Sequence, residues 1–440
     1  MAMNAISGEP ADRAAYRPLS LTGLPAYLAS VPALAARLGG GPDDWRCRDV
    51  ADGNLNSVFL VDGPAGSFCV KQALPYVRVA GESWPLDIHR ALFEYRYGVR
   101  LAPHVGALAP RLFHYDEDLF VIVMEKLEPH IILRKALVAG RHFPKAATDV
   151  ADYVAAASFH TSDLAGPFET KFADLELFSR NRELQRISVD LIFTDPYREV
   201  WRNKIIAPLQ GWGEALRGDI DLKAAVARAR LAYLGKAQSL IHGDLHSGSV
   251  MVTADETRVI DGEFAWVGPS GFDVGNFLAH YAMVWFAKPF HPGDAAEHAA
   301  FRTLIEGDIV DFWQRFETRF LEIWRACETE ADGFPRSHFD DPPAAARLET
   351  LRRGYVADIF RDAVAFLALK TIRRIVGYAQ IADFLTIEDI DRRALAMAGA
   401  LAFARSLLLH PDRYTDVAAV VAALHRFETA GLDPAATRPF

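Results

Sequence analysis

Apolar and polar residues alternate along the first part of the chain, and this pattern predicts strands. The alternating runs lie at residues 45–50, 57–61 and 67–72, where successive side chains would point to opposite faces of a sheet. Residues 119–124 are continuously apolar, which predicts a strand buried on both faces. Before the strands, apolar residues at helical spacing from Leu24 to Leu38 predict one opening helix that ends at a run of glycines.

Helical spacing of apolar residues dominates the rest of the chain. Short apolar runs at residues 239–242 and 258–260 are exceptions, and they predict two further strands. Residues 195–230 are expected to be helical, with interruptions at Pro208 and Gly211. The other predicted helices span residues 148–160, 272–285, 294–329, 344–380 and 388–409.

Composition and charge narrow the class of protein. The 440 residues are 51% hydrophobic and 24% charged, as in soluble globular proteins. A net charge of −9 argues against a nucleic-acid or anionic membrane surface, where a basic stripe is expected. Arg405 interrupts the apolar segment 394–410, which therefore indicates a buried helix and not a membrane span. The 3 cysteines lack metal-ligand spacing and suit a reducing cytoplasm.

Two acidic loops carry the strongest chemical signal. Asp244 follows one predicted strand, and Asp261 and Glu263 follow the next. Phosphoryl transferases of the protein-kinase type need one carboxylate that orients and deprotonates an acceptor hydroxyl, and others that hold Mg²⁺ on the nucleotide phosphates. We therefore expect Asp244 to be the acceptor-side carboxylate and Asp261 and Glu263 to be the metal ligands. A lone aspartate in a loop is more often a turn residue, so the ordered set carries the prediction.

Three polar residues around Asp244 are expected to support it. His242 and His246 have the i, i+4 spacing of metal ligands, but across a loop. We expect His242 to support the backbone of the loop. We expect His246 to contact the residues that touch the substrate, without touching the substrate itself. Asp273, at the start of the next helix, is either an N-cap or a prop for the backbone of the catalytic loop.

A glycine-bearing turn at residues 51–56 joins the first two strands. Gly53, Asn54 and Asn56 can adopt positive φ at low cost, so the turn can present backbone N–H groups to phosphate oxygens. A plain hairpin is the alternative for this turn taken alone.

The strand after this turn carries Lys71, where a kinase-like site places the amine that pairs with the α and β phosphates. A solvated lysine on an edge strand is the alternative. A helix predicted from Pro85 to Tyr97 carries Glu94, whose carboxylate can hold Lys71 extended. Glu82 competes for that role, and Glu94 is preferred because it lies well inside the helix.

The apolar strand at residues 119–124 leads into a connector, Glu125-Lys126-Leu127. A strand that enters a connector between two lobes can offer backbone C=O and N–H groups to an adenine ring. Glu125 and Leu127 are the candidates by position alone.

The order of these features predicts an ATP-dependent kinase with an α+β, protein-kinase-like bilobal fold. A small lobe with an antiparallel sheet would occupy residues 1–125, and a large, mainly helical lobe residues 126–440. ATP and Mg²⁺ are the expected cofactors, with Lys71 neutralising phosphate charge.

The chain also resembles the 5-methylthioribose kinase family, in the aminoglycoside-phosphotransferase and choline-kinase branch of the kinase-like fold. The likeness extends from about Asp52 to Asp389. The segments that carry it are residues 52–59, 70–78, 81–86, 242–251, 261–265, 268–273 and 372–377.

This resemblance implies ATP-dependent phosphorylation of the C1 hydroxyl of methylthioribose, a step of methionine salvage, by a homodimer. It also implies that Trp84 lies near the sugar and that Arg373 and Arg374 reach it. Neighbouring helical residues diverge by about 100°, so both arginines can face one pocket only near a helix end or a distortion. A pair of solvated arginines is the alternative.

The same residues are compatible with other functions. A kinase of another small alcohol, such as 5-deoxyribose, an aminoglycoside or a choline-like acceptor, is the nearest. The two arginines argue against a polycationic aminoglycoside, which needs an acidic pocket. A third hypothesis is a non-catalytic nucleotide-binding module. The presence of Lys71, Asp244, Asp261 and Glu263 argues against it.

Three residues depart from the family pattern. Ser249 stands where many kinases place a magnesium-binding asparagine, which gives Glu263 its expected role as a ligand. Gly262 stands in place of an expected proline, and Ser247 in place of a threonine. None of these changes removes a functional group, so we expect activity to be retained.

Overall fold

The structure is a computed structural model that describes residues 16–50, 55–77 and 81–435, without the side chains at positions 77, 81 and 82. It divides into two compact units. The first comprises residues 1–102 and 109–128, and the second comprises residues 103–108 and 129–440. No helix of the described part is long and apolar enough to cross a membrane.

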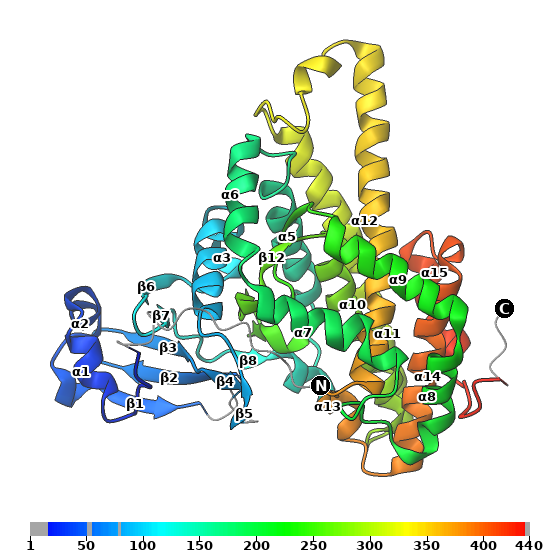
Figure 1. The fold of residues 1–440 in the computed structure, drawn as a ribbon, viewed down its shortest axis with the longest axis horizontal. Helices are drawn as coiled ribbons and strands as arrows, with labels where there is room; N and C mark the ends of the chain where they lie inside the picture. The colour runs from blue at the N-terminus through cyan, green and yellow to red at the C-terminus, as the bar shows by residue number, and fades with distance from the viewer. Residues whose placement is uncertain (1–15, 51–54, 78–80, 436–440) are drawn as a thin grey trace. The chain divides into compact units, whose positions relative to one another are not determined.

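The first unit is built on a five-stranded antiparallel sheet with the order β1-β2-β3-β7-β6 (Figure 1). The predicted strands of this region are therefore confirmed. Their bounds are Arg46–Asp49 for β1, Asn56–Asp62 for β2, Ser67–Ala73 for β3, Leu112–Asp116 for β6 and Val121–Met124 for β7.

Strand β7 is buried on both faces, as its continuous apolar sequence predicts. Val121 and Val123 belong to a cluster with the helices α1 (Leu24–Ala29) and α2 (Pro32–Leu38). Ile122 belongs to a second cluster, which includes residues at the start of α3 (Arg90–Val105). Since successive strand residues point to opposite faces, one short strand supplies both layers of the core.

The prediction of one opening helix from Leu24 to Leu38 is wrong, because a break separates α1 from α2. Pro32 is the first residue of α2, and Val31 before it is extended, with φ −107° and ψ 97°. Proline has no N–H for the preceding turn and disfavours the helical region in the residue before it.

The helix predicted from Pro85 begins instead at Arg90. Residues Gly81–Pro85 form strand β5, which pairs with β4 (Tyr76–Val77). Asp87 then turns the chain toward α3, since its Oδ1 accepts a hydrogen bond from the backbone N–H of His89 at 3.0 Å.

The second unit is mainly helical, as predicted. Every residue of α10 is buried, as expected for a helix that is apolar on all sides and lies at the centre of a core. The helices are α4 Leu133–Val138, α5 Ala146–His160, α6 Phe168–Phe178, α7 Arg182–Phe193, α8 Gln210–Gly218, α9 Ile220–Gly235, α10 Gly271–Ala287, α11 Ala295–Ala326, α12 Pro342–Val376, α13 Ala382–Leu385, α14 Ile390–Leu409 and α15 Val417–Phe427.

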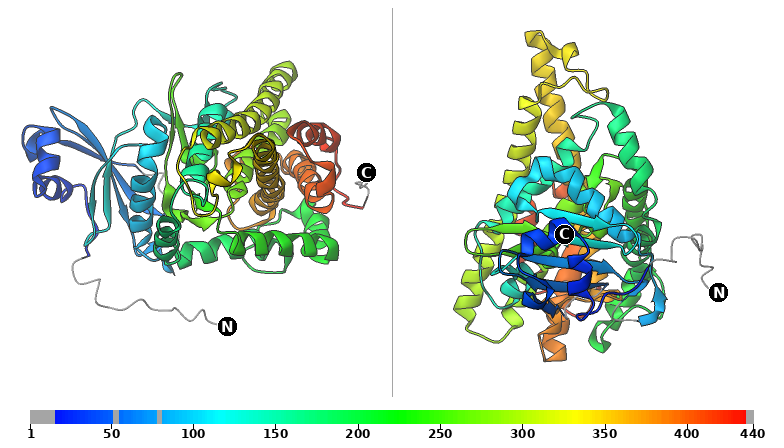
Figure 2. Two further views of the ribbon diagram at one scale, coloured as in Figure 1. Left: turned by 90° about the horizontal axis from the view of Figure 1, so that it is seen from above. Right: turned by 90° about the vertical axis from the view of Figure 1, so that its left-hand side faces the viewer.

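The two longest helices of this unit, α11 and α12, are joined by residues 327–341 at the end drawn in yellow (Figures 1 and 2). Asp294 caps α11 by accepting hydrogen bonds from the backbone N–H groups of Ala296 and Glu297. The sequence prediction of long helices on either side of a polar loop is confirmed.

The prediction of a helix over residues 195–230 is wrong for its first part. Residues Asp195–Tyr197 form one 3₁₀ turn, residues 198–206 are irregular, and a second 3₁₀ turn at Ala207–Leu209 precedes α8. The predicted interruption at Gly211 is also wrong, because Gly211 lies inside α8. Asp195 is buried and bridged by Arg198 at 3.0 Å and Arg202 at 2.7 Å, so these polar side chains fold back on it. The preceding helix, α7, was not predicted.

Two short antiparallel ribbons hold the acidic loops. β9 (Ser239–Ile241) pairs with β12 (Trp266–Gly268), and β10 (Val250–Val252) pairs with β11 (Thr257–Val259). The loop with Asp244 leads from β9 to β10, and the loop with Asp261 leads from β11 to β12.

Candidate active site

The backbone before Asp244 is fixed by Asp273 in the first turn of α10. Oδ2 of Asp273 accepts a hydrogen bond from the N–H of His242 at 2.6 Å, and Oδ1 accepts one from the N–H of Gly243 at 3.0 Å. Ser270, not Asp273, occupies the N-cap of α10. Asp273 therefore supports the backbone of the catalytic loop and does not cap the helix. Burial raises the pKa of its carboxyl group against the effect of these donors.

Gly243 is required for this turn. Its φ is +81°, and a Cβ added there would lie 2.2 Å from the backbone oxygen of Phe264. Only glycine combines this conformation with such a close approach. The turn brings the Asp244 loop against the loop that carries Glu263.

The Asp244 carboxylate lies among basic side chains from α12. The Nζ atom of Lys370 is 2.5 Å from Oδ1, and Nη2 of Arg374 is 3.9 Å from the same atom. Although burial opposes the shift, the Lys370 ammonium group holds the pKa of Asp244 well below its usual range. Asp244 is thus an anion with one oxygen held by Lys370.

Lys370 is a site residue that the sequence reasoning missed. Its side chain is 1% exposed, and burial lowers its pKa to about 7 while Asp244 opposes that shift. A signal was present in the sequence, because Lys370 precedes Arg374 by four residues and therefore lies on the same face of a helix.

The two histidines of the loop take the supporting positions expected of them. The buried ring of His242 contacts the backbone oxygen of Ile260 through Nε2 at 2.9 Å. Nδ1 of His246 accepts a hydrogen bond from the N–H of Gly248 at 3.0 Å, so its proton sits on Nε2, which is 3.4 Å from Oδ2 of Asp244. Burial lowers the pKa of His246 to about 3, so the ring is neutral.

Arg373 and Arg374 are both buried, in the last turn of α12. This position meets the physical condition for two adjacent arginines to share one region. Nη1 of Arg374 donates a hydrogen bond to the backbone oxygen of Ala379 at 3.2 Å. Nε and Nη1 of Arg373 are buried and have no partner among the described residues. Unpaired buried donors of this kind are typical of a site that binds a polar ligand.

The serines of the loop are structural. Ser249 is buried, and its hydroxyl donates a hydrogen bond to the backbone oxygen of Asp244 at 3.1 Å. Ser247 Oγ lies 3.1 Å from Nδ1 of His280 in α10. Both therefore tie the loop to itself and to the core.

The two expected metal ligands differ in exposure. The Glu263 side chain is buried, whereas Asp261 is exposed. Asp261 adopts the left-handed conformation with φ +73°, which is uncommon for residues other than glycine and clusters at functional sites. Nδ2 of Asn181 in α7 donates hydrogen bonds to the backbone oxygens of Glu263 and Ala265 and so fixes this loop.

In the first unit, the side chain that pairs with Lys71 is Glu94. Nζ of Lys71 lies 2.8 Å from Oε1 and 2.7 Å from Oε2 of Glu94, and both side chains are about nine-tenths buried. Strand alternation explains the pairing, because Val70 faces the α1–α2 cluster and Lys71 faces the opposite side, which α3 covers. The side chain of Glu82 lies outside the described part of the chain.

The phosphate turn is described only in part. Gly53 and Asn54 lie outside the described residues. Asn56 is buried, and its Oδ1 accepts a hydrogen bond from Nε of Arg90 at 3.2 Å. Arg90, which was not predicted, also donates to the backbone oxygen of Leu55 at 2.8 Å, so the start of α3 supports the end of this turn.

The remaining predicted residues of this unit lie on its sheet and connector. Trp84 is on β5 and partly buried. The backbone N–H of Glu125 donates to the oxygen of Arg111 at 2.8 Å, and its side chain accepts from the N–H of Arg111 at 3.1 Å. Leu127, next on the connector, is partly buried.

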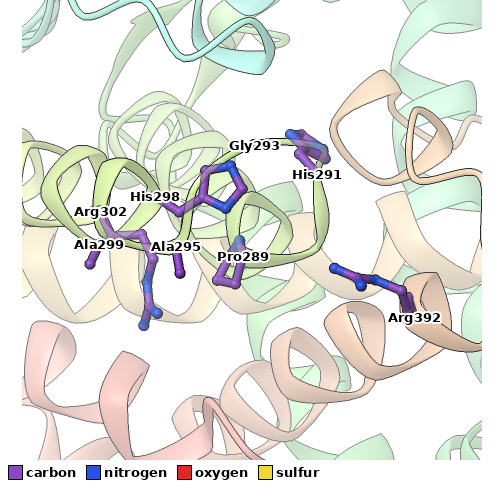
Figure 3. Close-up of a pocket in the computed structure, with 8 residues that line it drawn as sticks. All are labelled: Pro289, His291, Gly293, Ala295, His298, Ala299, Arg302 and Arg392. Carbon is purple, nitrogen blue, oxygen red and sulfur yellow. The ribbon is translucent and has the colours of Figure 1, made fainter.

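A pocket of about 380 Å³ lies in the second unit, where α10 ends and α11 begins (Figure 3). It contains none of the residues predicted for the site. His291 connects it to α13, because its Nε2 lies 2.7 Å from the backbone oxygen of Asp383. The residues that line it are Pro289, His291, Gly293, Ala295, His298, Ala299, Arg302 and Arg392.

A loop carboxylate held by a lysine, next to a loop with two more acids, is the arrangement that phosphoryl transfer requires. Comparison with protein families agrees, because residues 46–306 match the model of the phosphotransferase enzyme family. The chain belongs to this family.

Comparison with curated proteins is more specific. "Methylthioribose kinase 2" of Oryza sativa subsp. japonica is 37% identical over 422 residues, which cover 94% of this chain and 97% of that protein. "Methylthioribose kinase 1" of the same plant is 38% identical over 94% of this chain and 96% of that protein. "Methylthioribose kinase" of Escherichia coli O45:K1 is 36% identical over 92% and 97% of the two chains. Within its family, the chain is therefore a member of the methylthioribose kinases.

Proposed function

We propose that this protein transfers the γ-phosphoryl group of ATP to the C1 hydroxyl of 5-methylthioribose, a step of methionine salvage. Nearly full-length similarity to proteins named methylthioribose kinase carries the proposal. The surroundings of Asp244 supply the chemistry, since they combine an anionic carboxylate with unpaired guanidinium donors.

On the acceptor side, Asp244 orients the C1 hydroxyl and takes its proton on Oδ2. The hydroxyl oxygen forms a bond to the γ-phosphorus while the bond from that phosphorus to the bridging oxygen breaks, and ADP leaves with the electron pair. His246, which is neutral, carries an N–H toward the same oxygen of Asp244.

We assign sugar binding to Arg373, Arg374 and Trp84. The guanidinium groups offer fixed donors to sugar hydroxyls and to the transferred phosphoryl group. Trp84 would contact the sugar through its ring, as the family resemblance implies. Buried cations around Asp244 disfavour a polycationic acceptor such as an aminoglycoside.

Asp261 and Glu263 fit a site for Mg²⁺, because both carboxylates come from one short loop and carboxylate oxygens are the ligands this ion prefers. When bound, the ion would neutralise the charge of the nucleotide phosphates. The hydrogen bonds from Asn181 to the backbone oxygens of Glu263 and Ala265 support this proposal, because they fix the backbone of the loop that carries both carboxylates.

The nucleotide is assigned to the first unit. Lys71, held extended by Glu94, would pair with the α and β phosphates, and the turn with Gly53, Asn54 and Asn56 would surround them. The backbone C=O of Glu125 and the backbone of Leu127 would bind the adenine ring, since the N–H of Glu125 already donates to Arg111. The cytoplasmic location rests on the cysteine usage and the homodimer on the family resemblance, and both stay predictions.

A coupled assay of ADP release tests the proposal, with methylthioribose, 5-deoxyribose and choline as acceptors. We expect turnover with methylthioribose and little with choline. Asp244→Ala should lower kcat by about 10² to 10⁴, the usual cost of losing a positioned base. No turnover with methylthioribose, together with turnover of another acceptor, would contradict the substrate assignment. Near-wild-type activity of Asp244→Ala would contradict the assigned mechanism.

A further inference from the structure

We propose that Lys370 is a positioning residue for phosphoryl transfer, which binds one carboxylate oxygen of Asp244 and leaves the other oxygen to the acceptor hydroxyl. This inference rests on the proposed function. It concerns a residue of α12 that lies outside both acidic loops and one turn before the two arginines.

The contact of Lys370 with Asp244 is the shortest that this carboxylate makes. Nζ of Lys370 lies 2.5 Å from Oδ1, whereas Arg374 reaches Oδ1 only at 3.9 Å, beyond hydrogen-bond distance. Nε2 of His246 lies farther from its oxygen, 3.4 Å from Oδ2. The two oxygens of Asp244 are therefore inequivalent, and Oδ2 is the one available to a ligand.

Burial makes this contact rigid. The Lys370 side chain is 1% exposed, so its ammonium group cannot exchange Asp244 for water. The Asp244 side chain is 23% exposed, so the pair is open to solvent on the side of the aspartate. A carboxylate that is fixed at one oxygen and open at the other has one orientation to offer an acceptor, which lowers the entropic cost of reaching the reactive geometry.

The charged groups around the pair cannot take over the contact that Lys370 makes with Asp244. The titratable and charged groups that face it are Arg373 and Arg374 from α12, Asp273 and His280 from α10, Tyr233 from α9, whose phenol burial keeps neutral, Arg134 from α4 and His246 from the loop. Asp273 is already occupied by two backbone N–H groups, and burial keeps His280 neutral by lowering its pKa well below the usual range. The arginines add positive charge, but none of the described ones donates a hydrogen bond to Asp244.

Lys370→Met tests the inference, because it keeps an unbranched side chain only one atom shorter and removes the charge. We expect kcat for methylthioribose to fall by about tenfold or more, with a smaller change in KM, since a misplaced reacting group slows the chemical step. Loss of the neighbouring cation also raises the pKa of a carboxyl group, so the acid limb of the kcat profile should move up by about one pH unit or more. Lys370→Arg should bring the limb back toward its wild-type position.

Lys236→Met is the matched control. Lys236 also pairs with an aspartate of α12, since its Nζ lies 2.6 Å from Oδ2 of Asp362, but its side chain is 41% exposed and the pair makes no hydrogen bond or ion pair with Asp244. We expect its kcat and pH profile to match those of the wild type. If Lys370→Met raised KM alone and left the acid limb in place, Lys370 would be a binding residue and the inference would be wrong.

A second readout does not depend on activity. The ¹³C carboxyl resonance of Asp244, assigned by its absence in Asp244→Asn, can be titrated in the wild type and in Lys370→Met. We expect a pKa well below 3.9 in the wild type and a higher one in the variant. If the variant fails to fold, an ordinary wild-type pKa for Asp244 would by itself overturn the inference. A wild-type enzyme that phosphorylates no methylthioribose overturns the proposed function, whereas an unperturbed Asp244 overturns the role of Lys370 alone.

Discussion

At the scale of single residues, the site depends on how Asp244 is held. Asp273 fixes the backbone before it and Lys370 binds its carboxylate, so the loop and the side chain have separate supports. Asp273 and Lys370 come from α10 and α12, which are far from each other in the sequence.

The prop formed by Asp273 yields a prediction. Asn at this position keeps one acceptor oxygen, so Asp273→Asn should leave one of the N–H groups of His242 and Gly243 buried without a partner. We expect the free energy of unfolding to fall by about 1–3 kcal/mol, as urea denaturation would measure, and kcat to fall with it.

Asp294→Asn is the control for this change. Asp294 also accepts two backbone N–H groups, but at the exposed N-terminus of α11, where asparagine is as good a cap as aspartate. Its stability and activity should remain at the wild-type level. An Asp273→Asn variant that behaved in the same way would show that the prop is dispensable.

The sequence revealed the residues with a strong local signal and missed Lys370, whose four-residue spacing to Arg374 is a weak one. Asp244, Asp261 and Glu263 follow apolar strand runs, and Lys71 interrupts an alternating strand, so each was visible. Lys370 lies in a long helix whose charged residues look alike in sequence. Only the packing of α12 against the loop separates it from a solvated lysine.

At the scale of elements, the packing of α10 against α12 sets the distance between the loop and the basic residues. Two glycines of α10, one turn apart, make the contact. A Cβ at Gly271 would lie 2.6 Å from the backbone oxygen of Ile359, and one at Gly275 would lie 2.4 Å from that of Ala363. The two helices can approach this closely only because both residues lack a side chain.

We therefore expect Gly275→Ala to push α12 away from α10. Overpacking of this kind costs about 1–3 kcal/mol, and urea denaturation should show the loss. Because α10 carries Asp273 and α12 carries Lys370, kcat should fall more than the loss of folded protein accounts for.

Gly354→Ala provides the contrast. Gly354 lies inside α12 itself, but nothing is within 4 Å of a Cβ added there. Alanine should stabilise the helix by about 0.5–1 kcal/mol without changing kcat. Equal stability of the two alanine variants would contradict the tight contact of α10 with α12.

The errors in the predicted elements share a physical cause. Pro32 split a helix that hydrophobic spacing predicted as one, and the buried Asp195 drew Arg198 and Arg202 into ion pairs that replace the helix. In both cases a local feature interrupts the helix without changing the apolar spacing. Apolar periodicity reports which face is buried, but it does not report local breaks or polar contacts between side chains.

At the scale of the whole molecule, the chain combines a sheet unit that carries the Lys71–Glu94 pair with a helical unit that carries Asp244. The α+β class followed from the change of hydrophobic period along the chain. The substrate did not follow from the residues alone, because guanidinium groups can donate hydrogen bonds to many different sugars and phosphates. The family relationship supplies that assignment as a proposal.

The position of the new phosphate tests the central claim most directly. The product formed from ATP and methylthioribose can be examined by ¹H–³¹P correlation NMR. We predict a single phosphate ester whose phosphorus couples to the proton on C1 of the sugar. Coupling to a proton on another carbon, or the absence of any phosphate ester, would contradict the account.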